Sequence, residues 1–254
     1  MAKKMIWIAH ARYAEDAAVN LLCFSYAGGS AAYFSPLKAE IDSRINLCPV
    51  LYPGRERNAG IPNFDTLEAC AKAFVTENPQ LFQKPVAFFG HCTGSLVAYE
   101  AAIAAQKQYG VKPVLFFASS APAPSCENFF PDMQLTPEDM TRYLLDNGMI
   151  DAAFAENPMF RSYFLPLMQQ DLAMHLQYRP RVPYEKMHTK VHVLYGNQDP
   201  MFQDASLIAQ WGAFSEGVDA TEFSGGHFYL NQCQKPVGQL VTEHLLQELA
   251  GLSI

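Results

Sequence analysis

The fold is decided by the stretch PVAFFGHCTG at residues 85–94. Its first half is a short apolar run that predicts a buried strand, and the alanine-rich segment Ser95–Gln108 that follows predicts a helix. Between them, Gly90 to Gly94 has the G-x-S-x-G spacing of a nucleophile elbow, with Cys92 in place of serine. Such a turn holds the nucleophile in a strained conformation, and its glycines let neighbouring backbone pass close by. The sequence therefore predicts a nucleophilic Cys92 at a helix N-terminus, which favours thiolate and oxyanion charge.

Strand-like and helix-like segments alternate along the rest of the chain. The other strand-like runs are Val19–Ser25, Ile45–Tyr52, Val114–Ser119, Val191–Tyr195 and a run near Ala220–Phe223. Helices are expected after Ser30, from a capping-box pattern that has Asp65 as its cap, and from Val237 to Leu249. This alternation predicts an α/β fold with a mostly parallel sheet and helices on both of its faces.

A long segment in the middle of the chain lacks strand-like runs. It covers residues 121–187, and Thr136-Pro137 within it has the pattern of a helix start. Residues 160–177 are rich in Met, Phe and Tyr, which is too helical and too apolar for a linker. We therefore expect one domain over residues 1–254 that carries a helical insertion at residues 121–187.

An acid and a histidine follow two of the later strands. Asp199 lies in GNQDP at residues 196–200, and His227 lies in SGGHF at residues 224–228. Because the carboxyl ends of parallel strands meet at one edge of a sheet, both side chains should lie near Cys92. Nucleophile, then acid, then histidine is the chain order of an α/β-hydrolase triad. In this hypothesis His227 takes the proton of Cys92 or pairs with its thiolate, and Asp199 orients the imidazole.

Other acids and histidines fit such a site less well. Asp171, within the helical insertion, and Asp204, in a position to cap a helix, are the fallback acids. His188 and His192 are four residues apart, but they straddle a strand start and so share no helical face for a metal. The six cysteines are scattered with no C-x-x-C pair, which predicts neither a zinc site nor a disulfide framework. We therefore expect no bound metal.

A glycine-rich loop, Ala27-Gly28-Gly29-Ser30, follows the first strong strand. It matches neither the G-x-x-x-x-G-K-[ST] nor the G-x-G-x-x-G pattern of phosphate-binding loops. We expect the backbone N–H of Ala27 to form an oxyanion hole with the N–H of Thr93, the residue after the nucleophile. An ordinary glycine-rich turn is the alternative.

The charge balance excludes several classes of function. The chain has 18 Lys and Arg against 25 Asp and Glu, a formal net charge of −7, and no long basic run, which argues against nucleic-acid binding. The apolar run at the N-terminus is too short for a secretory signal, and nothing reaches the ~20 apolar residues of a membrane-spanning helix. We expect a cytoplasmic protein with no membrane and no nucleic-acid partner.

With these residues assigned, the chain resembles the type II thioesterases of nonribosomal peptide and polyketide synthesis, which have the α/β-hydrolase fold. The markers are residues 25–30, Tyr52-Pro53-Gly54-Arg55, the elbow at residues 90–94, the helical insertion, residues 196–200 and residues 225–228. The resemblance implies an acyl or aminoacyl substrate, held as a thioester on the phosphopantetheine arm of an acyl or peptidyl carrier protein. It also supports Ala27 and Thr93 as oxyanion donors and Asp199 as the acid, and it makes the insertion a lid over the acyl pocket. No bound cofactor is expected, because the pantetheine arrives on the partner.

Cys92 departs from the serine that is usual in this family. An acyl-Cys92 intermediate is itself a thioester, so its formation is close to thermoneutral and a second thiol can accept the group. Hydrolysis by water is the favoured function. Transfer of an acyl or aminoacyl group from one carrier to another stays open, because the relatives with a cysteine nucleophile act as aminoacyltransferases.

The sequence also bears on two further functions and on the surface to which a carrier protein would dock. A small-molecule esterase is not excluded by the elbow, whereas a non-catalytic scaffold is disfavoured because nucleophile, base and acid are all present. Carrier proteins are commonly acidic, so a net charge of −7 requires a local basic docking patch. The insertion offers Arg142, Arg161, Arg179 and Arg181.

Overall fold

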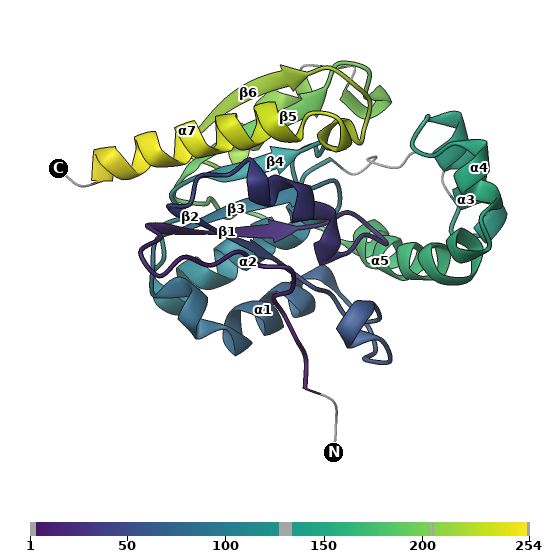
Figure 1. Cartoon of the computed structure of the whole chain (residues 1–254), viewed down its shortest axis with the longest axis horizontal. Coiled ribbons are helices and arrows are strands. Elements are labelled where there is room, and N and C mark those ends of the chain that lie inside the picture. The colour runs from purple at the N-terminus through teal and green to yellow at the C-terminus, as the bar shows by residue number, and fades with distance from the viewer. Residues whose placement is uncertain (1–3, 127–133, 203, 205, 253–254) are drawn as a thin grey trace.

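A computed structural model of the chain describes residues 4–126, 134–202, 204 and 206–252. Six strands form one sheet in the order β2-β1-β3-β4-β5-β6 (Figure 1), and each neighbouring pair is parallel. The strands are β1 (Val19–Phe24), β2 (Ile45–Pro49), β3 (Val86–His91), β4 (Phe116–Ser119), β5 (Lys190–Gly196) and β6 (Gly217–Phe223). The elbow therefore follows a central strand of the sheet.

Helices cover both faces of the sheet, because successive side chains of a strand point to opposite faces. On β3, Phe88 packs with residues of the helices α1 (Leu67–Glu77) and α2 (Gly94–Tyr109). Phe89 packs on the opposite face with the 3₁₀ helix η1 (Ala31–Ala39) and with α7 (Gln234–Leu252). Figure 1 shows α1 and α2 on one side of the sheet and α7 on the other. The predicted mostly parallel sheet with helices on both faces is confirmed.

Two helices differ from the prediction, one in its start and one in its type. Helix α1 begins at Leu67, so its N-cap is Thr66, whose Oγ1 accepts a hydrogen bond from the Ala69 amide at 3.1 Å. The prediction of Asp65 as the cap was wrong, because it set the helix start one residue too early. The helix expected after Ser30 is a 3₁₀ helix with Pro36 inside it, and proline has no N–H to donate to an α-helical hydrogen bond.

Several short helices connect the larger elements. They are η2 (Glu56–Asn58), η3 (Pro79–Phe82), η5 (Pro200–Phe202), α6 (Ser206–Ala209), η6 (Gln210–Ala213) and η7 (Tyr229–Asn231). Among the described residues, no helix is both long enough and apolar enough to span a bilayer.

A helical segment, residues 134–177, lies between β4 and β5. It contains α3 (Pro137–Asp146), α4 (Ala152–Glu156), the π-helical turn η4 (Phe160–Phe164) and α5 (Leu165–Gln177). As predicted, Thr136 caps α3, with its Oγ1 accepting the Asp139 amide at 3.1 Å. Residues 127–133 of the predicted insertion lie outside the described residues.

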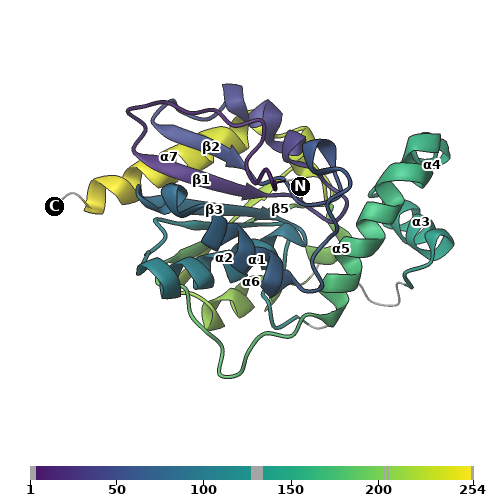
Figure 2. The same ribbon diagram turned by 90° about the horizontal axis from the view of Figure 1, so that it is seen from below.

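The helical segment stands beside the sheet rather than on one of its faces. Figures 1 and 2 show α3 and α4 set apart from the body of the molecule, with α5 running from them back to it. Its buried side chains form a small apolar cluster of their own, which includes Met140, Leu144 and Leu172. Ala27, from the loop after β1, belongs to the same cluster. The segment therefore packs directly on the loop for which the sequence predicts an oxyanion donor.

Candidate active site

Cys92 lies in the sharp turn between β3 and α2. Its φ of +54° is in the left-handed region, and only 5% of the residue is exposed. The glycines on either side explain how the turn is built: a Cβ on Gly90 would lie 2.3 Å from the Ser95 Cα, and one on Gly94 would lie 2.3 Å from the Phe24 carbonyl oxygen. Any larger residue would force these segments apart. The geometry is the strained elbow that the spacing of glycines predicts.

His227 and Asp199 meet the elbow from the ends of β6 and β5. His227 Nδ1 lies 3.0 Å from Asp199 Oδ2, and both residues are buried. The imidazole also shares a hydrogen bond with the Cys92 side chain. Asp199 is held in turn by the Met201 amide, which donates to its Oδ1 at 3.0 Å. The structure thus brings together the three side chains that the sequence predicts as nucleophile, base and acid.

The electrostatics of His227 are set by these two neighbours. Burial by itself lowers the pKa of His227, but the charge of the Cys92 sulfur and the hydrogen bonds to Asp199 and Cys92 raise it to about 10. A proton on His227 at neutral pH places a positive charge beside the Cys92 sulfur. A positive charge at this position favours the negative charge that a cysteine gains when it acts as a nucleophile.

A second layer of polar residues, which the sequence analysis missed, supports the histidine. His91 Nδ1 lies 2.8 Å from Ser119 Oγ, which lies 2.7 Å from Tyr229 Oη. Ser120 Oγ donates to the His227 carbonyl oxygen at 3.0 Å. Burial and the nearby charge of His227 hold the pKa of His91 well below its usual range, so His91 is a neutral neighbour. Ser119 is the last residue of β4 and Ser120 follows it, so their only signal in the sequence is two small polar residues at a strand end.

Ala27 and Thr93, the two residues predicted as oxyanion donors, both lie close to Cys92. Ala27 follows β1 and Thr93 is the N-cap of α2, and both are buried. Neither backbone amide donates any of the hydrogen bonds found within the described part of the chain. Ala27, Cys92 and His227 line a cavity of about 30 Å³, and Thr93 lines a neighbouring one of about 20 Å³. The two amides are therefore available to an acceptor placed next to the Cys92 sulfur.

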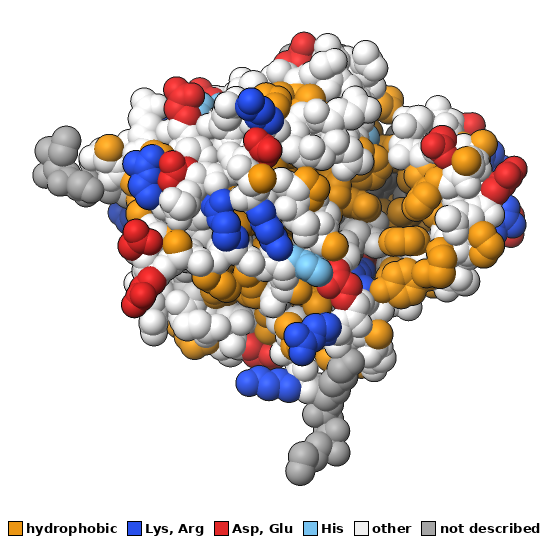
Figure 3. Space-filling model, in the orientation of Figure 1, with side chains coloured by type: hydrophobic (Ala, Val, Ile, Leu, Met, Phe, Trp, Pro, Cys, Tyr) orange, Lys and Arg blue, Asp and Glu red, His pale blue; other side chains and the backbone are white. Residues whose placement is uncertain are grey.

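Apolar side chains of the helical segment form one wall of the site. Tyr143, Leu144, Met149, Met168 and Leu172 line the cavity that holds Cys92. Figure 3 shows hydrophobic side chains gathered on the facing sides of the hollow between this segment and the body. The wall opposite the nucleophile is thus suited to an apolar group.

The fallback acids serve other purposes. Asp204 Oδ1 accepts the Ser206 amide at 2.8 Å at the start of α6, as a cap does. Asp171 lies on α5 and pairs with Arg55, with Asp171 Oδ2 lying 2.5 Å from Arg55 Nη2. The acid in contact with His227 is Asp199.

The residue types needed for a metal site do not come together in the described residues. No group of three or more His, Cys, Asp or Glu side chains is arranged to hold an ion within residues 4–126, 134–202, 204 and 206–252. His192, one of the two histidines weighed as ligands, instead lies with its Nε2 2.8 Å from Thr221 Oγ1 on the neighbouring strand β6.

Comparison with known sequences identifies relatives over nearly the whole chain. The family model described as "Thioesterase domain" matches residues 19–247. Thioesterase PikA5 of Streptomyces venezuelae is 30% identical over 252 residues, covering 95% of this chain and 86% of that protein. The gramicidin S biosynthesis protein GrsT of Aneurinibacillus migulanus is 26% identical over 249 residues, covering 96% of this chain and 95% of that protein.

Solved structures of thioesterases share the fold. The type II thioesterase BorB from the borrelidin biosynthetic cluster superposes with a TM-score of 0.83 at 28% identity, covering 96% of this chain and 100% of BorB. The thioesterase RedJ of Streptomyces coelicolor, from the prodiginine pathway, has a TM-score of 0.82 at 23% identity over 96% of this chain and 90% of RedJ, a likeness of fold. The predicted α/β-hydrolase fold is confirmed by these neighbours. The chain belongs to the thioesterase domain family.

Proposed function

We propose that this thioesterase removes acyl or aminoacyl groups from the phosphopantetheine arm of an acyl or peptidyl carrier protein in nonribosomal peptide or polyketide synthesis. The observation that carries the proposal is the hydrogen-bonded set of Cys92, His227 and Asp199 at one edge of the sheet. The likeness to the type II thioesterase BorB and to the gramicidin S biosynthesis protein GrsT supports the pathway. A cysteine paired with a histidine that an acid orients can form and break a covalent thioester.

In the acylation step, the Cys92 thiolate attacks the carbonyl carbon of the substrate thioester. The carbonyl oxygen gains negative charge, which the amides of Ala27 and Thr93 stabilise by donating hydrogen bonds. The tetrahedral intermediate collapses, the carbon–sulfur bond to the pantetheine arm breaks, and the departing sulfur takes a proton from His227. The product is an acyl-Cys92 thioester together with a free pantetheine thiol.

Acylation changes His227 from an acid into a base. Two of the causes that raise its pKa, the charge of the Cys92 sulfur and the hydrogen bond to it, end when that sulfur is acylated. Its lower pKa leaves the imidazole neutral, so that it can act as a base. It accepts a proton from a water molecule, which attacks the acyl carbon, and the carbon–sulfur bond to Cys92 then breaks. The free acid leaves, and Cys92 and His227 return to their charged forms. Asp199 stays hydrogen-bonded to Nδ1 and keeps the other ring nitrogen directed at the reacting atoms.

Substrate entry requires movement of the helical segment, which we propose is a lid. The cavity beside Cys92 measures about 30 Å³, and a cavity needs roughly 10–15 Å³ of this measure to hold one water molecule. An acyl group on a pantetheine arm does not fit into that space. Because Leu144, Met149 and Met168 form the outer wall, displacing α3 and α5 opens the site without disturbing the sheet.

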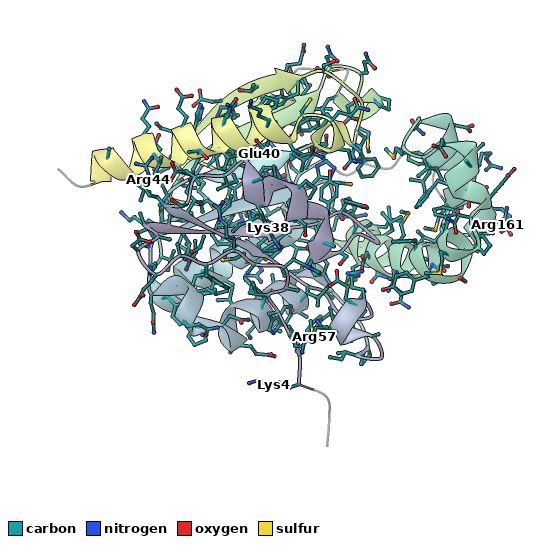
Figure 4. All side chains as sticks on the ribbon, in the orientation of Figure 1. Lys4, Lys38, Glu40, Arg44, Arg57 and Arg161 are labelled. Atoms are coloured by element: carbon teal, nitrogen blue, oxygen red, sulfur yellow. The ribbon has the colours of Figure 1, made fainter. Side chains whose placement is uncertain are left out.

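Basic residues lie on both the helical segment and the body. Among the arginines of the predicted insertion, Arg142 pairs with Asp139, and Arg181 lies 3.5 Å from Glu185. Arg161 lies on the outer side of the helical segment, and Lys38 and Arg57 lie on the body (Figure 4). We propose that an acidic carrier docks through exposed basic residues of this kind, since the enzyme's overall charge of −7 repels it.

Transfer to a second carrier is the other candidate function, and the cysteine at the elbow is the observation that favours it. A second pantetheine thiol can attack acyl-Cys92 as water does, because one thioester is exchanged for another. The test loads one carrier with a labelled acyl group and adds enzyme and an empty second carrier. Hydrolysis predicts label in the free acid. Rapid appearance of label on the second carrier, with little free acid, would reject hydrolysis as the main activity.

A small-molecule esterase is distinguished by its substrate. The proposed function predicts that kcat/KM for an acyl-loaded carrier or an acyl-pantetheine thioester exceeds that for an oxygen ester of the same acid. Equal or faster cleavage of the oxygen ester would overturn the assignment to carrier-bound thioesters. The Cys92→Ala protein is the control for background hydrolysis.

A further inference from the structure

One carboxylate joins the helical segment to two loops of the body. Asp171, on α5, is 8% exposed and accepts three hydrogen bonds. The donors are the Gly28 amide at 2.7 Å, Arg55 Nη2 at 2.5 Å and Asn63 Nδ2 at 3.0 Å. Gly28 follows β1, whereas Arg55 and Asn63 follow β2. Figure 2 shows α5 running past the edge of the sheet where these loops lie.

Arg55 is a buried cation that constrains the position of the Asp171 carboxylate. The residue is 1% exposed, and its guanidinium lies 5.1 Å from the centre of the Tyr52 ring. A buried cation is tolerated only beside an opposite charge, and Asp171 supplies that charge. When α5 moves away with the lid, both charges lose their partner. The ion pair therefore favours the position of α5 in which Asp171 contacts Arg55 and Gly28, which we call the seated position.

Gly28 is the contact between this ion pair and the reacting centre. Its φ is +76°, and a Cβ at this position would lie 2.9 Å from the Met168 Cβ, so the backbone of α5 rests directly on the loop. The Gly28 amide belongs to the peptide bond that follows Ala27. Holding that amide restricts the movement of the loop that also carries the Ala27 N–H, which belongs to the preceding peptide. Ala27 lines the cavity that contains Cys92.

We propose that Asp171 is a positioning residue that completes the oxyanion hole only when α5 is seated. Paired with Arg55, it holds the Gly28 amide, so that the Ala27 N–H is aimed at the substrate oxygen. This inference rests on the proposed function, because it assigns a task to the same oxyanion hole. It couples closure of the lid to the ability to stabilise the charged intermediate.

The test compares two reactions of Cys92 in one protein. Thioester turnover passes through an oxyanion, whereas alkylation of Cys92 by iodoacetamide is a displacement at a saturated carbon and forms none. Removing an oxyanion donor costs about 10²–10³ in kcat. We expect Asp171→Leu to lower kcat for an acyl-pantetheine thioester about 100-fold, at the low end of that range, while the alkylation rate of Cys92 stays within about twofold.

Matched variants separate positioning from a structural effect. Arg55→Leu/Asp171→Asn keeps an oxygen that can accept from the Gly28 amide and leaves no buried cation without its partner, so it should keep most of the kcat that Arg55→Leu/Asp171→Leu loses. Asp146→Asn removes an exposed carboxylate of α3 and should leave both reactions unchanged. If Asp171→Leu does not fold, the double variant Arg55→Leu/Asp171→Leu, which removes both buried charges, carries the same expectation.

Four outcomes overturn the inference. An unchanged kcat in Asp171→Leu would show that Ala27 needs no such positioning. A parallel loss of kcat and of alkylation rate would show a structural role alone. Equal loss of kcat in Arg55→Leu/Asp171→Asn and Arg55→Leu/Asp171→Leu would show the same. Absence of thioester turnover in the unmodified protein would overturn the proposed function itself, together with this inference, and is thereby distinguished from a failure confined to the variants.

Discussion

The two sides of the active site are built in different ways. Cys92, Asp199 and His227 each follow a strand of the sheet, and their neighbours hold them by hydrogen bonds and close backbone contacts. The helical segment opposite them contributes Met and Leu side chains, and it exposes Phe154 and Met159 on its surface. In the proposed function, the sheet edge holds the reacting groups, which we call the rigid side, and the apolar wall, the adaptable side, selects among acyl groups.

The largest effect should follow from changing the nucleophile on the rigid side. Cys92→Ala removes the atom that forms the covalent intermediate, so turnover of an acyl-loaded carrier should fall by about 10⁴-fold or more, as in other hydrolases that lose a triad residue. Measured kcat for released acid is the readout. Cys233→Ala changes a partly exposed cysteine outside the site and should leave turnover within twofold. Substantial turnover by Cys92→Ala would remove the basis of the mechanism.

His227→Gln should cost about 10³-fold in kcat, because both proton transfers depend on the imidazole. It should also change the pH dependence of Cys92 alkylation. In the unmodified protein the His227 pKa of about 10 keeps a positive charge beside the sulfur, so the rate of alkylation by iodoacetamide from pH 6 to 9 should exceed the rate in His227→Gln and change less with pH. The same rate and the same pH dependence in both proteins would contradict the raised pKa of His227.

The same raised pKa gives a stability effect with a definite sign. The contribution of protonated His227 to folding is fully present below its unfolded pKa of about 6.5 and is lost as the pH rises toward its folded pKa of about 10. The difference in melting temperature between the unmodified protein and His227→Gln should therefore shrink from pH 6.5 to pH 10. A difference that grows with pH would exclude the raised pKa.

Asp199 and Asp204 both lie on the body of the molecule, so the same substitution can be compared at the two positions. Asp199→Asn removes the charge that orients His227 and should lower kcat about 10²-fold, the low end of what general acid–base catalysis contributes, because Cys92 and His227 can still pair. Asp204→Asn makes the same chemical change at a helix cap and should leave kcat within about twofold. Equal effects of the two substitutions would break the assignment of Asp199.

Substitutions in the apolar wall of the helical segment should change the preference among substrates rather than the rate of the chemical step. Met149→Ala enlarges the cavity at its outer wall and should raise kcat/KM for longer acyl chains relative to short ones by about tenfold, the value of a few methylene contacts. Met159→Ala, on the exposed surface of the same segment, should not alter the preference. Chain-length series of acyl-pantetheine thioesters give the readout. An unchanged preference in Met149→Ala would show that the helical segment does not shape the pocket.

The smallest effect compares two threonine caps with the same geometry. Thr66 caps α1 on the body and Thr136 caps α3 in the helical segment, each accepting an amide at 3.1 Å. Thr66→Ala should lower the free energy of unfolding by about 1 kcal/mol. Thr136→Ala should leave global unfolding nearly unchanged and instead speed amide hydrogen exchange in α3, because that helix can open locally. Equal global losses would show that the helical segment unfolds only with the sheet.

The proximity of Cys92, Asp199 and His227 could be predicted from the sequence, whereas the contacts of the helical segment could not, for a physical reason. Cys92, Asp199 and His227 are each marked by a local pattern, an apolar strand that ends in glycine and turn residues. Parallel strands then bring these ends together. The cap at Thr66 was misplaced by one residue because helix boundaries depend on capping geometry that spacing alone does not fix.

The contacts that join the helical segment to the body leave no such local pattern. Asp171 meets Gly28, Arg55 and Asn63 across more than a hundred residues of chain. From the sequence, Asp171 could be seen only as a second-choice acid. The polar contacts from Ser119 and Ser120 to the histidines are equally non-local. Such pairings are decided by tertiary packing, which periodicity does not encode.

The central claim is that Cys92 carries the acyl group as a thioester during turnover. Intact-mass spectrometry of the enzyme, acid-quenched within the first turnover of an acyl-pantetheine thioester, tests it most directly. The proposed covalent mechanism predicts an added mass equal to the acyl group, located on the peptide that contains Cys92 and removed by neutral hydroxylamine. The His227→Gln protein, if acylated, should retain the adduct longer, because deacylation needs the base. Turnover without any adduct on Cys92, or with the adduct on another residue, would contradict the account.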